Sequence, residues 1–332
     1  MKVNKELVFE AGEHFASCHA STILPLENGD ILVAYFAGTK EKDPDVGIWL
    51  SRRVSGVWQK PVLIAKDGDI PTAHWNPVLF EGKKGEIRIC YKVGETIPGW
   101  VTHTRVSFDL GKSFGDWEEY SKEHPACGPV RSKPLVLSDR LIAPNSVETQ
   151  TAWRPFVDVS FDGGKTFSKL SDIPINTSDK SKENYFLGKG AIQPTLWEND
   201  GVIYALLRTT EGWIFKTESR DMGKTWSEAK KTSMPNNNSG IETVQAGKRV
   251  YLICNPVSEN WGARYPLNVY YSDDNCETFH EFLCLESEPT KGLPEGVKSE
   301  FSYPAGVYKN GRLYISYTYN RRQIAVVEVE TE

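Results

Sequence analysis

The chain has 332 residues, of which 39% are hydrophobic and 11% aromatic, and its formal net charge at pH 7 is -5. This is enough apolar material for one large core, and the acidic balance excludes a basic surface for nucleic acid or anionic membranes. The six cysteines include no CxxC pair and no zinc-type spacing, so we expect buried, reduced thiols. We expect residues 1–332 to form a single domain, with no nucleic-acid partner and no membrane partner.

Predicted strands run from one end of the chain to the other. A strand-like piece at 6–10 comes first. The N-terminus has no apolar signal-type run, which predicts a cytoplasmic protein, with a secreted protein as the alternative if a signal peptide has been removed. A hairpin follows at 23–34 with Asn28-Gly29 at its turn, and later extended segments are expected at 46–50, 87–91, 157–159, 191–195, 206–209 and 267–271. The last three strands are predicted at 307–308, 313–319 and 324–330. This pattern is typical of an all-β protein.

One octet recurs along the chain at nearly constant spacing. It reads SFDGGKTF from Ser160, SFDLGKSF from Ser107, SRDMGKTW from Ser219 and SDDNCETF from Ser272, with a degenerate copy, SRRVSGVW, from Ser51. The first residues of successive copies lie 56, 53, 59 and 53 positions apart. The central Asp and Gly suit a hairpin turn, and the final aromatic residue suits packing against a neighbouring segment. A repeated unit of this size predicts a repeat architecture built from small antiparallel sheets.

Six such units account for nearly the whole chain and predict an all-β, six-bladed β-propeller. Neither the first strand nor the last three strands carry an octet. We expect the N-terminal strand to complete the last sheet, because this closes the ring and removes free edges. Seven blades are the alternative if residues 177–189 contain additional strands.

The octet resembles the Asp box of the sialidase superfamily, and the whole chain is similar to a sialidase-like family of bacterial and plant proteins. The segments that carry the second resemblance are HAST from His19, WNPV from Trp75, NSG from Asn238 and SYPA from Ser302. The resemblance implies a sialidase-like propeller. The sequence contains no HExxH, phosphate-binding or dinucleotide motif, so we expect no cofactor.

The sialidase resemblance also implies roles for single residues. Sialidases bind the substrate carboxylate with three arginines, and Arg208 and Arg264 look like the second and third. Their nucleophilic tyrosine starts the last blade, where Tyr303 stands. Their acid/base aspartate lies in a blade-one loop that corresponds to 41–45, with Asp45 as first choice and Asp43 as second. The alternative for the two arginines is a structural ion pair with Asp or Glu across blades.

Two positions depart from the sialidase pattern. His19 stands where the first arginine is expected, and Gln193 lies near the position of the glutamate that polarises the tyrosine. An amide cannot act as a base, so Glu300 or Glu242 would have to substitute for that glutamate. His19 would take the missing arginine's place as a ligand of the substrate.

Polar residues recur at the starts of the predicted blades, and a propeller brings these starts together around its axis at one face. Four of them are added as candidates for binding a sugar: His74, Asn76, Lys92 and Lys133. Trp75 and Trp100 are expected to stack on a sugar face. His103, in contrast, is expected to be a hydrogen-bonded structural residue.

Three functions fit these residues. The first is an exo-glycosidase for a sialic- or uronic-acid-type sugar, with Asp45 as acid/base, Tyr303 as nucleophile, and Arg208 and Arg264 as carboxylate clamp. The second is a polysaccharide lyase that eliminates at a uronate with His19 and Tyr303 as its base and acid. The third is a glycan-binding propeller without catalysis. The expected partner is an acidic oligosaccharide in each case, and the oligomeric state is left open.

Overall fold

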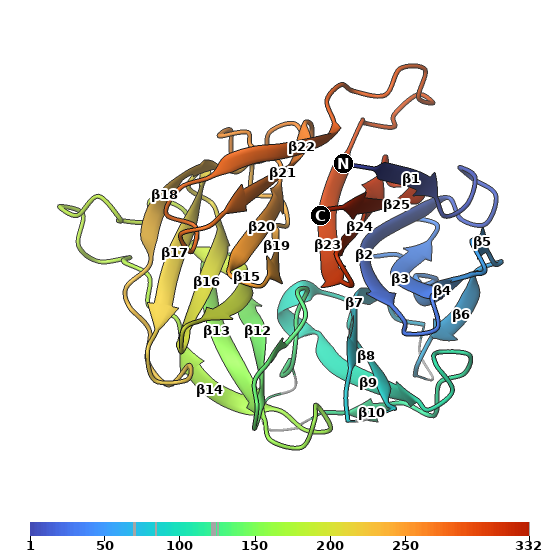
Figure 1. The fold of residues 1–332 in the computed structure, drawn as a ribbon, viewed down its shortest axis with the longest axis horizontal. Helices are drawn as coiled ribbons and strands as arrows, with labels where there is room; N and C mark the ends of the chain where they lie inside the picture. The colour runs from blue at the N-terminus through green and yellow to red at the C-terminus, as the bar shows by residue number, and fades with distance from the viewer. Residues whose placement is uncertain (69–70, 84, 121–123, 125, 332) are drawn as a thin grey trace.

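The computed structural model describes residues 1–68, 71–83, 85–120, 124 and 126–331. Within these ranges the chain forms strands and one short 3-10 helix, Ile97–Gly99. Six antiparallel sheets stand around a ring, which confirms the predicted six-bladed propeller (Figure 1). The described residues include no helix that is both long enough and apolar enough to cross a membrane.

The first three blades follow one another along the chain. Blade one has five strands: β2 (Ser17–Pro25), β3 (Ile31–Gly38), β4 (Gly47–Val54), β5 (Val57–Trp58) and β6 (Val62–Ala65). Blade two consists of β7 (His74–Glu81), β8 (Ile87–Val93), β9 (Val101–Ser107) and β10 (Glu118–Glu119). Blade three consists of β11 (Leu135–Val136), β12 (Leu141–Glu148), β13 (Trp153–Ser160) and β14 (Ser168–Asp172).

The last three blades complete the circle. Blade four consists of β15 (Ala191–Asn199), β16 (Val202–Thr209), β17 (Trp213–Ser219) and β18 (Lys230–Pro235). Blade five consists of β19 (Glu242–Ala246), β20 (Arg249–Cys254), β21 (Leu267–Ser272) and β22 (His280–Glu286). Blade six combines β23 (Phe301–Lys309), β24 (Arg312–Tyr319) and β25 (Gln323–Glu330) with β1 (Val3–Leu7).

The N-terminal strand closes the ring, as predicted, but at different bounds. β1 pairs with β25 from Val3 opposite Val329 to Leu7 opposite Ala325, so the predicted strand at 6–10 begins and ends too late. The reason is that Val8 and Phe9 leave the sheet and are buried among residues of blades one and six. Their apolar side chains pack in the core, which removes them from water, and do not extend the strand.

The alternative of seven blades is wrong. Residues 177–189, all of which the structure describes, contain no strand, and a single bridge between Asn176 and Tyr185 organises this loop. The inner strand of blade three is also short, because only Leu135–Val136 pair with β12. The segment before it therefore reaches the axis as irregular backbone.

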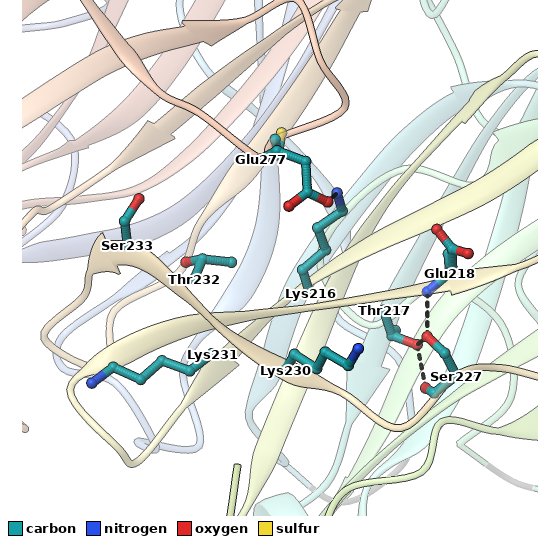
Figure 2. A pocket seen from close by; sticks show the side chains of 10 residues that line it. Lys216, Thr217, Glu218, Ser227, Lys230, Lys231, Thr232, Ser233 and Glu277 are labelled. Carbon is teal, nitrogen blue, oxygen red and sulfur yellow. Dashed lines mark hydrogen bonds and ion pairs between the residues drawn. The ribbon is translucent and has the colours of Figure 1, made fainter. Parts of the chain in front are cut away.

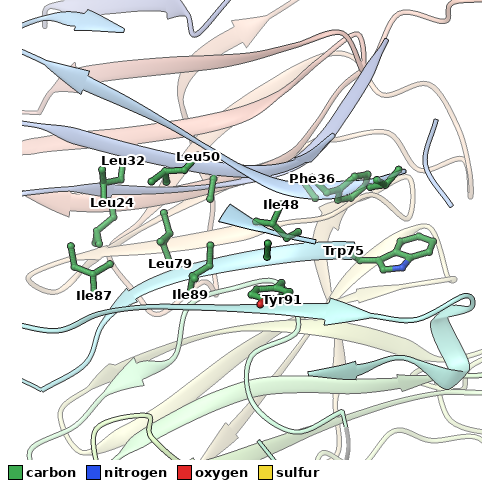
Figure 3. Packing of buried hydrophobic residues seen from close by; sticks show 14 of the residues in the cluster. Leu24, Leu32, Phe36, Ile48, Leu50, Trp75, Leu79, Ile87, Ile89 and Tyr91 are labelled. Atoms are coloured by element: carbon green, nitrogen blue, oxygen red, sulfur yellow. The ribbon is translucent and has the colours of Figure 1, made fainter. Parts of the chain in front are cut away.

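The hydrophobic core lies between neighbouring blades. Leu32 and Phe36 of blade one belong to one buried cluster with Leu79 and Tyr91 of blade two (Figure 3). Similar clusters join the other blades. Each fully buried large apolar side chain contributes roughly 1.5–3 kcal/mol, so the packing fixes how the blades sit against one another.

The octets fold as the predicted turns. Asp162 accepts hydrogen bonds from the Thr166 amide at 2.9 Å and from the Thr166 hydroxyl at 2.7 Å, and the Gly164 amide donates to Ser160 Oγ at 2.8 Å. The same bonds to the Asp recur in three other octets. Cys276, which replaces the glycine of one octet, adopts the left-handed φ of 64° that glycine would take more easily. The octets are thus self-contained structural turns.

Four inner strands share a kink that the sequence pattern did not predict. β2, β7, β15 and β23 each shift register near their first residues, and each shift contains a residue with positive φ. These residues are Ala20, Asn76, Gln193 and Tyr303, with φ values of 54°, 41°, 50° and 53°. A bulge of this kind re-aims side chains at the end of a strand. A positive φ costs free energy in residues that have a Cβ, and residues in this conformation cluster at functional sites. The inner strand ends are therefore candidates for a functional site.

Trp226, the last residue of one octet, offers a test of the packing. Its side chain is 8% exposed within the cluster that joins blades three and four, and its indole donates to Ser171 Oγ at 3.1 Å. We predict that Trp226→Ala lowers the free energy of unfolding by about 3 kcal/mol in chemical denaturation, because it leaves a cavity. Phe161→Ala is the control, since Phe161 is 66% exposed. Equal stabilities of the two variants would contradict the prediction.

Candidate functional site

A cavity of about 470 Å³ is lined by residues from all six blades, which places it over the ring axis. Its charged lining residues are five cations and two carboxylates: Lys42, Lys189, Arg208, Arg264 and Arg321, with Glu41 and Glu148. The lining also includes Tyr303, Trp153 and Trp261. The excess of positive charge makes this cavity suited to an anionic ligand.

Tyr303 lies at the centre of the charged groups. Three guanidinium carbons are close to its ring centroid: Arg264 at 5.4 Å, Arg208 at 5.5 Å and Arg131 at 5.9 Å. Arg208 Nη1 also donates a hydrogen bond to the Tyr303 hydroxyl at 2.9 Å. The left-handed backbone at Tyr303 is part of the β23 bulge, which brings the phenol to this position. Three guanidinium groups therefore lie close to this one side chain.

Arg208, near the end of β16, is held by neutral groups. Its guanidinium donates to Asn238 Oδ1, to Gln193 Oε1 and to the Tyr303 hydroxyl, each at 2.9 Å. Arg208 is 3% exposed. None of the ion pairs in the described part of the chain involves Arg208. The alternative that Arg208 forms a structural ion pair is therefore wrong.

Arg264 forms the ion pair that Arg208 lacks. Its Nη1 donates to Glu300 Oε1 at 2.6 Å. Glu300 also accepts from Arg321 Nε at 3.0 Å, and Arg321 in turn contacts Glu41 of blade one. Burial raises the pKa of Glu300, but the charges of Arg264 and Arg321 outweigh it, and the pKa lies below its ordinary value. Blades one, five and six are thus joined by an ionised network at the edge of the cavity.

Gln193 and Glu148 connect Arg208 to blade three. Gln193 Oε1 accepts from Arg208, and Gln193 Nε2 lies 3.4 Å from Glu148 Oε1. Glu148 is half-buried at the end of β12, directly opposite Trp153 of β13. Burial raises the pKa of the Glu148 carboxyl, whereas the Arg208 charge and the Gln193 hydrogen bond act in the opposite direction. This carboxyl therefore holds a proton more readily than an exposed glutamate does.

His19 lies behind Tyr303. It is 1% exposed, the two ring centroids are 4.2 Å apart, and Nδ1 is 2.8 Å from Thr318 Oγ1. Its Nε2 has no hydrogen-bond partner among the described residues. Burial, followed by the charges of four arginines, lowers its pKa well below the ordinary value, so the ring is neutral. His19 is positioned to support Tyr303 and does not line the cavity.

The predicted acid/base loop reaches the cavity through a different residue. Asp45 is exposed, and its Oδ2 accepts from the Thr39 amide at 2.8 Å and from the Thr39 hydroxyl at 2.9 Å. The described lining includes neither Asp45 nor Asp43, but it includes Glu41 of the same loop. The predicted loop does reach the cavity, but the carboxylate that lines it is Glu41.

Other predicted site residues are turned into the protein and form internal contacts. Lys92 is fully buried and donates to Thr102 Oγ1 at 2.6 Å, and Lys133 donates to Thr22 Oγ1 at 3.0 Å. Burial lowers the pKa of each lysine to about 8. Asn76 is 6% exposed at the β7 bulge. As predicted, His103 is structural: its Nδ1 is 3.0 Å from Asp67 Oδ2.

The aromatic residues expected to stack on a sugar are also buried. Trp75 is 2% and Trp100 is 6% exposed, and both belong to the core cluster of blades one and two. The expectation for these two residues is wrong, because each indole packs in the core. Trp153 and Trp261 line the cavity instead, with ring centroids 6.2 Å apart and planes at 78°.

A second cavity of about 380 Å³ lies on the outer part of blade four, beside an octet of blade five (Figure 2). Two of its lysines have partners within the protein: Lys216 pairs with Glu277, and Lys231 lies 4.0 Å from the centre of the Trp213 ring. It contains no residue of the predicted site. The axial cavity is therefore the candidate functional site.

Comparison with known proteins places this fold in a family. Residues 29–315 match the family model described as a BNR repeat-like domain. The chain belongs to this BNR repeat-like family. No curated protein matches the sequence. The family assignment agrees with the repeated octets and with the sialidase-like propeller expected from them.

Solved structures similar to this BNR repeat-like protein include one of unknown function and several sialidases. A Dyadobacter fermentans protein of unknown function is 17% identical, with a TM-score of 0.76 and 99% of each chain covered. A Hadza microbial sialidase is 14% identical, with a TM-score of 0.77 and 98% of this chain and 68% of that chain covered. Trypanosoma rangeli sialidase in complex with the inhibitor DANA is 15% identical, with a TM-score of 0.74. The alignment covers 98% of this chain and 59% of the T. rangeli chain, and it establishes the sialidase-like fold.

Several lining residues of this BNR repeat-like protein were missed by sequence analysis. Arg321 follows β24 in a tight turn, and nothing local shows that this turn faces the axis. Glu148 and Trp153 flank a hairpin whose position depends on blade three as a whole. One usable signal exists, because the kinked residues Asn76, Gln193 and Tyr303 each precede a proline.

His74 provides a pH test that separates structural from binding residues. Its Nε2 accepts from the Asp67 amide at 2.8 Å, and burial lowers its pKa from 6.5 to about 4. Between these values the unfolded chain binds a proton that the folded protein does not, so stability falls as pH falls from 6.5 to about 4. We predict a smaller pH dependence of the urea midpoint over this range in His74→Gln. The same slope as in the wild type would overturn this assignment.

Proposed function

We propose that this protein is a glycosidase that acts on a carboxylate-bearing sugar, of the sialic- or uronic-acid type, at the non-reducing end of a glycan. The observation that carries the proposal is Arg208, a buried cavity residue whose charge has no partner among the ion pairs of the described residues. A buried cation without a counter-charge is costly, and a bound carboxylate supplies that charge together with a charge-assisted hydrogen bond.

The remaining lining supports a sugar acid over a small carboxylate. Arg264, whose guanidinium carbon is 5.4 Å from the Tyr303 ring centroid, and Arg321 add positive charge to the lining. The perpendicular pair Trp153 and Trp261 offers aromatic faces of the kind that pack on the apolar face of a sugar ring. A volume of about 470 Å³ lies within the usual range for small-molecule sites.

Tyr303 is the proposed nucleophile or cation stabiliser. In a sugar whose anomeric carbon bears a carboxylate, an approaching carboxylate nucleophile is repelled, whereas a phenol is not. Arg208 donates to the phenol oxygen, which supports negative charge there as the anomeric carbon is approached. Tyr303 and the arginine that binds the carboxylate would thus act on adjacent atoms of the substrate.

A uronate lyase is the second candidate, and one observation favours it. The ring centroids of His19 and Tyr303 are 4.2 Å apart, which joins a histidine and a tyrosine in one site. Because His19 is 1% exposed, Tyr303 would have to take the proton from the substrate carbon. Arg208 would neutralise the uronate carboxylate in this reaction as well.

Incubation with sialosides and uronate-terminated oligosaccharides tests the proposal, with mass spectrometry and ultraviolet absorbance read on the same sample. A glycosidase adds water across the bond, and its products gain the mass of water. A lyase gives an unsaturated, absorbing product with no added water. Binding of these glycans in calorimetry, without either product, would contradict both enzymes and support a glycan-binding propeller.

Tyr303→Phe tests the site within the same assay. We predict a loss of kcat/KM of roughly 10²-fold or more, because the variant keeps the ring beside the arginines but has no oxygen to act on the substrate. Its affinity for the free acidic sugar should remain within a few-fold of the wild type. The control is Tyr314→Phe on β24, which removes a phenol oxygen outside the cavity. Full activity of Tyr303→Phe would refute the assignment.

A further inference from the structure

We propose that Glu148 is the proton carrier of the axial cavity, giving a proton to the departing glycosidic oxygen and recovering one from water. This inference rests on the proposed glycosidase function and deepens it. It assigns the acid/base role to blade three, whereas the sequence pattern pointed to Asp45 of blade one.

The position of Glu148 is the first support. Its side chain lines the same cavity as Tyr303 and Arg208, at the end of β12. Gln193 links it to the reacting region, because Gln193 contacts Glu148 at 3.4 Å and Arg208 at 2.9 Å, and Arg208 contacts the Tyr303 hydroxyl. The carboxyl and the phenol therefore face one ligand space from different blades.

The surroundings of Glu148 are the second support. Among the described residues, the side-chain hydrogen bond of Glu148 is the long contact with Gln193, and none of the ion pairs there includes it. Trp153 stands directly opposite it in the β12–β13 pairing and lines the cavity beside it. An indole neighbour and a weak hydrogen bond leave the ionised carboxylate poorly solvated. The pKa of Glu148 is accordingly raised by burial.

The other carboxylates near the cavity and in the 41–45 loop, unlike Glu148, have close ion-pair or hydrogen-bond partners. Glu41 contacts the Arg321 guanidinium. Glu300 is held by Arg264 and Arg321. Asp45 is exposed and accepts two hydrogen bonds from Thr39. Glu41 and Glu300 are paired with guanidinium groups, and Asp45 is not among the described lining residues. Glu148 has no ion pair within the described chain and is therefore the carboxyl of the cavity best suited to hold and release a proton.

The cations that share the cavity with Glu148 act against its protonation, and the Arg208 charge lowers its pKa. They are Lys42, Lys189, Arg208, Arg264 and Arg321, whereas a negative charge on Glu41 acts in the opposite direction. A bound substrate carboxylate neutralises part of this positive charge. Substrate binding should therefore raise the proton affinity of Glu148 at the moment when the proton is needed.

In the proposed reaction, Glu148 first gives a proton to the leaving oxygen and then recovers one from water. The bond between the anomeric carbon and the glycosidic oxygen breaks, both electrons stay on that oxygen, and the oxygen takes the proton of the neutral Glu148 carboxyl. The electron-poor anomeric carbon is held against the Tyr303 oxygen. Water then adds its oxygen to that carbon, and the proton released by water returns to the Glu148 carboxylate. The products are the free acidic sugar and an alcohol.

Glu148→Gln tests this role with pairs of substrates that share one sugar and differ in the leaving group. The probes are sialyllactose against para-nitrophenyl sialoside, and a glucuronate-terminated disaccharide against para-nitrophenyl glucuronide. Para-nitrophenolate leaves without a proton, whereas a sugar alcohol needs one. We expect the variant to lose about 10²- to 10⁴-fold in kcat/KM on the oligosaccharide, and less than about tenfold on the aryl glycoside. Glu118→Gln on β10, outside the cavity, is the matched control and should match the wild type on both.

The pH profile gives a second readout that a structural role would not move. For the wild type on the oligosaccharide, kcat/KM should fall as pH rises through the pKa of Glu148, because the acid form is the active one. This limb should be absent from Glu148→Gln. If the wild type is active but the variant loses both leaving groups equally, Glu148 is not the acid and the glycosidase proposal stands. If the wild type cleaves none of the probes, both proposals fall.

Discussion

The hydrogen bonds between β1 and β25 join the two ends of the chain, and the rest of the molecule depends on them. Five residue pairs, from Val3 with Val329 to Leu7 with Ala325, add the first strand to the last sheet. The ring is then closed, and each sheet packs its faces against two neighbours. The kinked ends of four inner strands are held around one axis, so a cavity lined by six blades exists only in the closed ring.

Within that ring, the four arginines near Tyr303 are balanced to different degrees. Arg131 contacts Glu242 at 3.2 Å and the Pro304 carbonyl at 2.7 Å, Arg264 pairs with Glu300, and Arg321 pairs with both Glu300 and Glu41. Arg208 has the neutral partners Asn238, Gln193 and Tyr303. Like charges close together repel, and the surrounding packing holds them in place. The cavity lining therefore has more positive than negative charge, which would favour an anionic ligand.

Three residues singled out in the sequence, Arg208, Arg264 and Tyr303, line the axial cavity. They reach it from different places in their blades: the end of β16, the loop before β21 and the start of β23. Lys92 and Lys133 were singled out as well, yet their long side chains turn inward and donate to the interior. Which direction a side chain takes depends on local register, and the bulges change that register without an obvious mark in composition.

The sequence by itself indicated six repeated units, the turn in each octet and the closing role of the N-terminal strand, and the structure excluded a seventh blade. These follow from local chemistry repeated at a fixed spacing, so they can be read without knowledge of distant contacts. Only the tertiary structure decided that Glu41, and not Asp45, lines the axial cavity, and that Arg321 and Glu148 line it as well. The cavity joins Glu41 to Arg321 across 280 positions of sequence, and no local pattern encodes which turns meet at the axis.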